Sequence, residues 1–397
     1  MTGKGFSTRA VHGAAAPPTV QQPASVPIYQ TSTWRFSSSE EFAEVLASAR
    51  PGHAYGRGYG NPTVEAFESV MADLEETEAA FGFSSGASAI FTTLLLLARR
   101  DGAGPGRIVA SRHLYGGTYS LFAEVMPTLG IEVDLIDAAD LDVVAGALEG
   151  ASAFYCETIA NPLCRVLDLP ALAELCREKG VPTVVDSTFA SPWLCAPSSF
   201  GFDFVVHSVT KFIAGHSDVI GGVVCCSAED RKRIRHLAIE VGGAMQPFDA
   251  WLTVRGLESL DVRIRRQCSN AQLLADALAE DQRIVVVHYP GLTGHPDHET
   301  ARRLFRQDAY GGVLSVEVDG GVDEAVRWCD ALQVAWIGAS LGGAHTLVCH
   351  PASTTHRQVA RESRREFGLA DGLVRISAGL EDGGDLVDDF VQALKAV

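Results

Sequence analysis

The sequence predicts an α/β protein with a mostly parallel sheet, followed by a smaller second α/β unit. From about residue 61 onward, short β-branched segments alternate with helical segments, which is typical of parallel strands joined by right-handed crossovers. The predicted strands are apolar throughout, as strands buried on both faces are. A long helical stretch around residues 247–281 then leads into the second unit.

The individual elements are marked by their ends. Pro62 lies in the first turn of one predicted helix, and Gly180 closes another. The helices are predicted at 62–76, 141–148 and 170–179, and the strands at 107–110, 131–136, 153–157, 183–186, 204–207 and 222–226. Strands of the second unit are predicted at 283–288, 313–318 and 346–349.

The chain is expected to divide into three parts. Residues 1–60 are rich in Pro, Gly, Ser and Thr and are predicted to form an extended arm. Residues 61–255 form the main domain, and residues 256–397 form the smaller C-terminal domain.

Composition disfavours several classes of protein. With 397 residues, of which 47% are hydrophobic, the chain can bury a large core. A net charge of -17 repels phosphate backbones and argues against nucleic-acid binding. The N-terminus has no apolar core of signal-peptide length, and the longest apolar run, near 90–98, is too short to span a membrane, so we expect a cytoplasmic protein without membrane contact. Nine cysteines are scattered and never spaced as CxxC, which suggests neither a disulfide framework nor a metal site.

One of the five lysines has an unusual setting. Lys211 lies in HSVTKFIAGHSDVIGG, after an apolar strand and beside glycines, without an acidic neighbour for six residues. Burial there would lower the pKa of its amine, and a neutral amine is what Schiff-base chemistry requires. On this chemistry alone, a surface lysine with its stem buried is about as good an interpretation.

Other polar groups fit the same site. Ser208 and Thr210 flank Lys211, and Ser84 to Ser88 open an apolar helix whose free N–H groups can hold a phosphate. Asp186 ends the strand VPTVVD, and the next predicted strand ends at His207. A carboxylate at that edge can pair with a pyridinium nitrogen. Each feature alone has an ordinary structural explanation, but together they predict a pyridoxal 5'-phosphate site.

The whole chain then resembles the transsulfuration family of pyridoxal-phosphate enzymes: cystathionine γ-synthase, cystathionine γ-lyase and methionine γ-lyase. The matching motifs, in the family's order, are PIYQTSTW at 27–34, NPTVEAFE at 61–68, FSSGASAI at 83–90, LYGGTYSLF at 114–122, ETIANPL at 157–163, VVDSTFASP, SVTKFIAGHSDVIGG, AWLTVRGLESL, ASLGGAHTL, HPASTTH and VRISAGLED. The resemblance implies a fold-type-I, aminotransferase-like subunit with a seven-stranded sheet. It also implies a homotetramer, built as a dimer of dimers, whose active sites are shared across the dimer.

The resemblance also implies residue roles. Lys211 carries the cofactor as a Schiff base and moves protons, Tyr115 stacks on the ring and acts as acid or base, and Asp186 holds the ring nitrogen. The phosphate is bound by Gly86, Ala87, Ser208 and Thr210, together with Tyr55 and Arg57 of the neighbouring subunit. Arg375 binds the substrate α-carboxylate, with Ser340 and Asn161 beside it.

The implied reaction is γ-elimination of the C–S lyase type, from a methionine-, homocysteine- or cystathionine-like L-amino acid, through a vinylglycine intermediate, to a 2-oxo acid and ammonia. A γ-replacement synthase acting on an O-acyl-homoserine, or a specialised γ-lyase with an unusual leaving group, remains an alternative. A regulator that binds the cofactor without turnover is the alternative outside this class.

Several positions depart from the family pattern. Four residues instead of three lead from Arg57 to Asn61, which adds Tyr59 to the arm. The other departures are Ala87, Gly117, Ser187, Ala339 and His345. Together they favour an unusual substrate, although neutral drift is the better explanation of each position taken alone.

Overall fold

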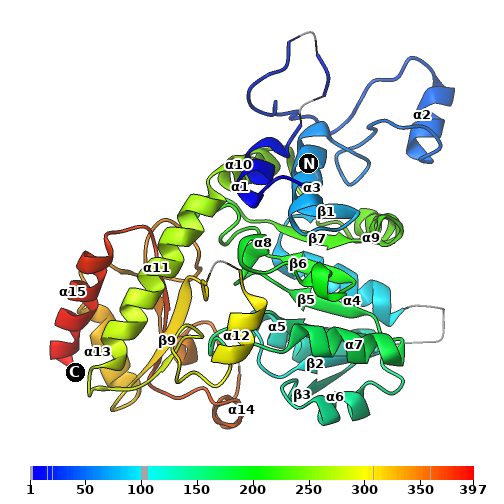
Figure 1. The fold of residues 1–397 in the computed structure, drawn as a ribbon. Coiled ribbons are helices and arrows are strands. Elements are labelled where there is room, and N and C mark those ends of the chain that lie inside the picture. Colours follow the sequence, from blue (N-terminus) through cyan, green and yellow to red (C-terminus); the bar gives the residue numbers. More distant parts are fainter. Residues whose placement is uncertain (1–2, 16, 20, 100–105, 307, 358) are drawn as a thin grey trace.

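A computed structural model describes residues 3–397 except 16, 20, 100–105, 307 and 358. Its larger sheet has seven strands in the order β1-β7-β6-β5-β4-β2-β3 (Figure 1). The strands are β1 (Ala79–Phe83), β2 (Arg107–Ser111), β3 (Glu132–Ile136), β4 (Ala153–Glu157), β5 (Thr183–Asp186), β6 (Phe204–His207) and β7 (Gly222–Cys226). Neighbours from β3 to β6 are parallel, whereas β7 runs antiparallel to both β6 and β1.

Helices cover both faces of this sheet. One face carries α4 (Gly86–Ala98) and α9 (Ala228–Val241), whose side chains share a core with Tyr155 and Val184. The other face carries α3 (Pro62–Leu74), α6 (Leu141–Ala147), α7 (Leu169–Lys179) and α10 (Pro247–Glu258). The predicted parallel sheet is therefore confirmed, and its burial on both faces explains the unbroken apolar strands.

The helix ends follow from local sequence. Asn61 precedes α3, and its side-chain oxygen accepts the N–H of Thr63 at 3.0 Å. Asp168 caps α7 in the same way, and Gly180 closes it with φ +66°, a conformation that a Cβ would strain. The cap residues therefore mark the boundaries to within a residue or two of the predicted ones.

The second unit is a five-stranded sheet in the order β10-β11-β12-β9-β8. Its strands are β8 (Ile284–His288), β9 (Val313–Val318), β10 (Trp336–Ile337), β11 (Leu347–Cys349) and β12 (Leu373–Ser377). The helices α11 (Leu260–Ala279), α13 (Val322–Asp330) and α15 (Gly383–Ala393) pack against it around Trp328 and Phe390. The strands β1, β10 and β12 were absent from the sequence prediction.

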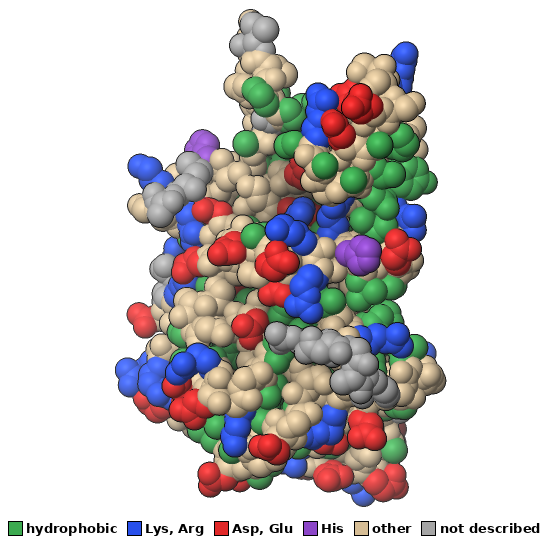
Figure 2. Space-filling view, turned by 90° about the vertical axis from the view of Figure 1, so that its right-hand side faces the viewer, with side chains coloured by type: hydrophobic (Ala, Val, Ile, Leu, Met, Phe, Trp, Pro, Cys, Tyr) green, Lys and Arg blue, Asp and Glu red, His purple; other side chains and the backbone are tan. Residues whose placement is uncertain are grey.

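The N-terminal segment is less extended than predicted. Its first helix, α1 (Phe6–His12), packs on α3 and α10 and buries Ala10. A second helix, α2 (Ser39–Leu46), begins at Ser38, whose hydroxyl accepts the N–H of Glu41. Between and around these helices the chain stands away from the body in two projections (Figures 1 and 2). The boundaries at 60/61 and 255/256 stay predictions.

One buried arginine joins the two units. Arg263 on α11 donates to the carbonyls of Phe212 at 2.8 Å, Ile213 at 3.1 Å and Gly256 at 2.7 Å. Burial lowers the pKa of its guanidinium to about 10. A Cβ at Gly215 would lie 1.8 Å from this guanidinium, so only glycine fits there. Arg263 thereby fixes the segment that directly follows Lys211.

The surface charges are mixed, and the cysteines are buried. Figure 2 shows Asp and Glu side chains interspersed with Lys and Arg over one face, rather than gathered in a single patch. All nine cysteines are free and buried. Within the described ranges, no helix combines the length and the apolar character that a membrane crossing requires.

Candidate active site

Three neighbouring strands place polar side chains at one edge of the sheet. Glu157 ends β4, Asp186 ends β5 and His207 ends β6, and Glu157 lies directly beside Asp186 in the strand register. Side chains alternate along a strand, so Glu157 and Asp186 face the α4 side. His207 faces the opposite side, where its Nε2 lies 2.6 Å from Oε1 of the fully buried Glu75. The two predicted strand-end residues are therefore both at this edge but on different faces.

The first turn of α4 lies against the end of β6. Ser85 caps the helix by accepting the N–H of Ser88 at 3.1 Å, while Ala87 is exposed. A Cβ at Gly86 would lie 2.8 Å from Cβ of Ser208, so this close approach requires glycine. Free N–H groups and the positive end of the helix dipole then point to one place beside Ser208, as a phosphate site requires.

A threonine that the sequence prediction missed connects two of these groups. The backbone N–H of Thr188 donates to Asp186 at 2.9 Å, and its Oγ1 accepts the N–H of Ser208 at 2.8 Å. Thr210 is placed differently from expectation, since its hydroxyl bonds to both the N–H and the carbonyl of Gly221. Binding of a phosphate by the Thr210 hydroxyl would require that carbonyl bond to be exchanged.

Lys211 is mostly buried and faces the second unit. Its Nζ donates to Oγ of Ser340 at 2.9 Å. Burial, and after it the nearby positive charge of Arg375, lower the pKa of the amine to about 8. A substantial fraction of this amine is therefore neutral near physiological pH, which is the form a carbonyl group reacts with.

Arg375 is held at the centre of β12 and is 3% exposed. Its Nη1 donates to Oδ1 of Asn161 at 3.2 Å, and its Nη2 donates to the carbonyl of Ser340 at 2.8 Å. Its buried Nε has no hydrogen-bond partner among the described residues. A guanidinium with an unused N–H fits an anionic ligand such as a carboxylate.

Ser340 contacts the side chains of both Lys211 and Arg375. Its Oγ accepts from Lys211 and its carbonyl accepts from Arg375, while its backbone has φ +97°. This conformation is rare for a residue with a Cβ and is typically retained at functional sites. The three residues, which are far apart in the sequence, therefore form one cluster, as predicted.

Tyr115 lies at the turn after β2 and is 45% exposed. Its backbone N–H donates to Oε1 of Glu157 at 2.7 Å. A Cβ at Gly117 would lie 2.5 Å from the Tyr115 ring, so the departure at Gly117 gives the ring its present position.

The two carboxyls at this edge have raised pKa values. Burial, followed by the charge of Asp186, raises the pKa of Glu157 to about 8 despite its two backbone N–H bonds. Burial likewise raises the pKa of Asp186, against the effect of its bonds to Thr188. A cation placed beside Asp186 would offset this cost.

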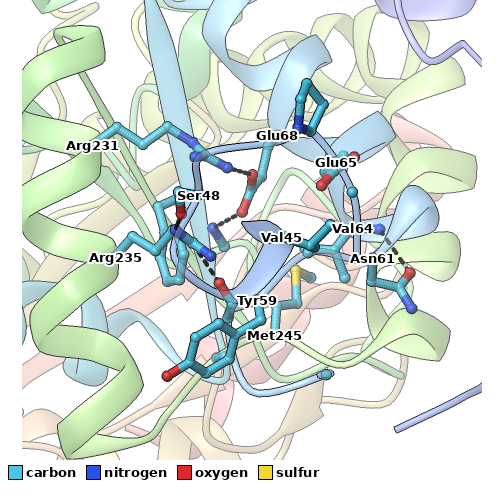
Figure 3. A pocket seen from close by; sticks show the side chains of 18 of the residues that line it. Val45, Ser48, Tyr59, Asn61, Val64, Glu65, Glu68, Arg231, Arg235 and Met245 are labelled. Carbon is cyan, nitrogen blue, oxygen red and sulfur yellow. Dashed lines mark hydrogen bonds and ion pairs between the residues drawn. The ribbon is translucent and has the colours of Figure 1, made fainter. Parts of the chain in front are cut away.

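The predicted partner-facing residues lie apart from this cluster within the chain. Tyr55 is exposed, and Nη1 of Arg57 donates to the carbonyl of Ile239 at 2.7 Å, at the end of α9. The ring of Tyr59 lies 5.5 Å from the guanidinium of Arg235. Figure 3 shows these two residues at a cavity of about 270 Å³ between the arm and α9, which includes none of the predicted site residues. Tyr59 thus anchors the arm to its own chain.

The remaining departures have local explanations. His345 stacks on Trp336 at 4.0 Å, and Ala339 is exposed beside Ser340. Oγ of Ser187 accepts a hydrogen bond from Thr158 at 3.0 Å. Among the described residues, no cluster of His, Cys, Asp and Glu could hold a metal ion.

Known proteins resemble this chain along its whole length. The family described as Cys/Met metabolism PLP-dependent enzyme matches residues 7–395. An L-methionine gamma-lyase from Pseudomonas putida is 38% identical over 396 residues, which is 99% of this chain and 98% of that relative. An O-succinylhomoserine sulfhydrylase from Pseudomonas aeruginosa is 36% identical, covering 100% and 97%. The crystal structure of cystathionine gamma-lyase from Lactobacillus plantarum, complexed with L-serine, matches with a TM-score of 0.92 and 31% identity over 99% of both chains.

The described residues fit pyridoxal phosphate. The Lys211 amine is available for reaction, and Asp186 is a half-buried carboxyl whose desolvation cost is only partly offset by its neighbours. The α4 N-terminus supplies N–H donors beside Ser208, on the same side of the sheet as Asp186. Amine, carboxyl and anion-binding N–H groups are what the aldehyde, ring nitrogen and phosphate of this cofactor need.

The lowered pKa of Lys211 predicts a pH dependence. In trace acylation of the cofactor-free protein, modification of Lys211 should rise through about pH 8 and level off above it. An ordinary lysine amine becomes neutral only near pH ~10.4. The exposed Lys232 serves as the internal reference in the same mass-spectrometric digest. Parallel pH curves for the two lysines would contradict the burial of Lys211.

The close approach at Gly86 gives a second prediction. In Gly86→Ala, the added methyl collides with Ser208, a strain of ~1–3 kcal/mol, so the Kd for pyridoxal phosphate should rise roughly 5- to 150-fold. Absorbance titration of the cofactor-free protein measures this. Gly146→Ala on α6 is the matched control, because a Cβ there meets nothing within 4 Å. An unchanged Kd in Gly86→Ala would show that the α4 N-terminus is not part of the phosphate site.

Proposed function

Because the chain belongs to the Cys/Met metabolism family of pyridoxal-phosphate-dependent enzymes, we propose that it catalyses γ-elimination on an L-amino acid. The predicted fold-type-I, aminotransferase-like architecture is confirmed by the solved relatives. The reaction consumes water and gives a 2-oxo acid, ammonia and the protonated leaving group. The observation that carries the proposal is the cluster in which Ser340 joins Lys211 to Arg375.

The cofactor is held, in this proposal, by residues from four segments of the chain. Gly86, Ala87, Ser208 and Thr210 bind the phosphate, Asp186 binds the ring nitrogen, Lys211 binds the aldehyde carbon, and Tyr115 stacks on the ring. When bound, pyridoxal phosphate supplies an electron sink that stabilises negative charge at the substrate Cα.

The chain's own groups orient the substrate and move its protons. Arg375 binds the α-carboxylate, using the Nε that has no partner among the described residues. The Lys211 amine removes the proton from Cα and carries it between carbon atoms, a role that suits a pKa near 8. The Tyr115 phenol donates a proton to the group that leaves Cγ.

In our leading proposal the bond that breaks is Cγ–S and the group that leaves is a thiol, as in the relatives named L-methionine gamma-lyase. Ala339 offers no carboxylate for a distal ammonium, which disfavours a cystathionine-like substrate. A γ-replacement on an O-acyl-homoserine is the second candidate, because the O-succinylhomoserine sulfhydrylase is nearly as similar. A specialised γ-lyase with another leaving group is the third.

We also propose a homotetramer, built as a dimer of dimers, acting in the cytoplasm. The projecting arm supports this proposal, because it stands away from its own body and exposes large apolar side chains, Ile28, Phe42 and Tyr55, that a partner could cover (Figure 1). Tyr55 and Arg57 would then complete the phosphate site of the neighbouring subunit.

Absorbance with added amino acids tests the function. The purified protein should show a band near roughly 420 nm that changes with L-methionine or L-homocysteine, with 2-oxo acid and ammonia formed without a thiol acceptor. Lys211→Ala should lose the band and the activity. Oxo acid formed only from O-acyl-homoserine, or product formed only with an added thiol, would favour the replacement synthase. Absence of the band after addition of pyridoxal phosphate would refute the proposal.

Mixed subunits test the shared site. Lys211→Ala and Arg57→Ala should each be nearly inactive, but mixed dimers contain one site with both native residues. If Arg57 acts across the dimer, random mixing should restore about a quarter of wild-type activity. Unfolding and refolding the two variants together, with each alone as control, measures this. A mixture no more active than its components would place Arg57 outside the neighbouring site.

A further inference from the structure

Glu157 is a buried carboxyl at the sheet edge that has no part in the reaction proposed above. It ends β4, lies beside Asp186 in the register and is 4% exposed. Nothing in its position requires a carboxyl, because the equivalent ends of β2 and β3 are Ser111 and Ile136. A carboxyl buried there must therefore be satisfied by specific hydrogen-bond partners.

The two carboxyl oxygens of Glu157 bind two different loops. Oε1 accepts the backbone N–H of Tyr115 at 2.7 Å, and Oε2 accepts the backbone N–H of Asn161 at 3.1 Å. Tyr115 ends the turn that leads from β2 to α5 (Gly116–Ser120), and Asn161 lies in the turn after β4. One side chain therefore fixes the distance between these two turns.

Each of the two turns carries a different part of the proposed site. Tyr115 carries the ring that stacks on the cofactor and donates to the leaving group. Asn161 holds Arg375 through its Oδ1, at 3.2 Å from Nη1. The path from Tyr115 through Glu157 and Asn161 to Arg375 consists entirely of hydrogen bonds between buried or partly buried groups.

We propose that Glu157 is a positioning residue that sets the Tyr115 ring and the Arg375 guanidinium at a fixed separation. This inference rests on the roles proposed for Tyr115 and Arg375. A substrate held by its α-carboxylate then presents its Cγ substituent at the Tyr115 phenol. Such a constraint raises the rate because it holds the reacting groups within about 1 Å of their productive positions.

The carboxyl group is chemically suited to this task. Two oxygens on one carbon accept two N–H groups at once, whereas an amide can accept only with its oxygen. In Glu157→Gln, the amide NH₂ must face one of the two backbone N–H donors, so one of the two turns loses its anchor. Glu157→Asp keeps both oxygens but moves them back by one methylene.

Steady-state kinetics and visible circular dichroism of the holoenzyme test the inference. Glu157→Gln should raise KM and lower kcat, with kcat/KM reduced roughly 10- to 100-fold. The reason is that both Arg375, which binds the substrate carboxylate, and the Tyr115 phenol, which donates the proton, are displaced. The visible dichroism of the bound cofactor should change, since Tyr115 lies against the ring. Glu157→Asp should recover part of kcat/KM.

Asp389→Asn is the matched control. Asp389 is also buried and accepts backbone N–H groups from Gln333, Val334 and Ala335, but it lies on α15, in the second unit. Its replacement should lower stability without altering KM or the dichroism. If Asp389→Asn changes the kinetics as much as Glu157→Gln, a general loss of stability explains both and the inference fails.

The outcomes separate this inference from the proposed function. A wild-type protein without a cofactor band would refute the function. A wild-type holoenzyme with normal turnover, together with a Glu157→Gln protein whose kcat, KM and dichroism are unchanged within twofold, would refute only the positioning role. Should Glu157→Gln fail to fold, Glu157→Asp takes its place, and wild-type kinetics and dichroism in that variant would overturn the inference.

Discussion

The structure depends on a constraint imposed by its parallel sheet. Neighbouring parallel strands end at one edge, so the last residues of β4 and β5 lie side by side and bring together two carboxyls, the buried Glu157 and the half-buried Asp186. Such a pair is unfavourable unless donors or cations surround it. The N–H groups of Tyr115, Asn161 and Thr188 supply the donors. The hydrogen bonds that satisfy these two carboxyls thus bring together the turns from which the site is built.

The strands that lead to this edge could be predicted from the sequence. The strands at 153–157, 183–186, 204–207 and 222–226 match β4 to β7 residue for residue, because buried apolar runs with turn residues after them are a strong signal. Asp186, the last residue of β5, and Lys211, four residues after β6, could be singled out as candidates from their positions, although each taken alone also has an ordinary structural interpretation. The helix at 86–98 follows from its serine cap.

Other features depend on contacts that local patterns do not contain. The strand β1, AAFGF, was missed because alanine and glycine have low strand propensity, and it forms by pairing with β7. The antiparallel direction of β7 was also missed. Alternation of helix and strand predicts parallel neighbours, but β7 is joined to β6 by a loop without a helix, and a loop allows either direction. Glu157 stands in a motif that the sequence did single out, yet its role depends on two turns 42 and 4 residues away. Arg375 was identified only through the family resemblance, because it lies within a strand rather than after one.

The buried cysteines have a consequence for a protein that handles sulfur compounds. Thiol exchange begins with attack by a thiolate, so it requires both exposure and ionisation. All nine cysteines are buried, and burial raises the pKa of thiols such as Cys164 and Cys268 to about 12. A sulfhydryl product released at the active site therefore meets a surface without reactive thiols, and the folded chain resists mixed-disulfide formation with its own products.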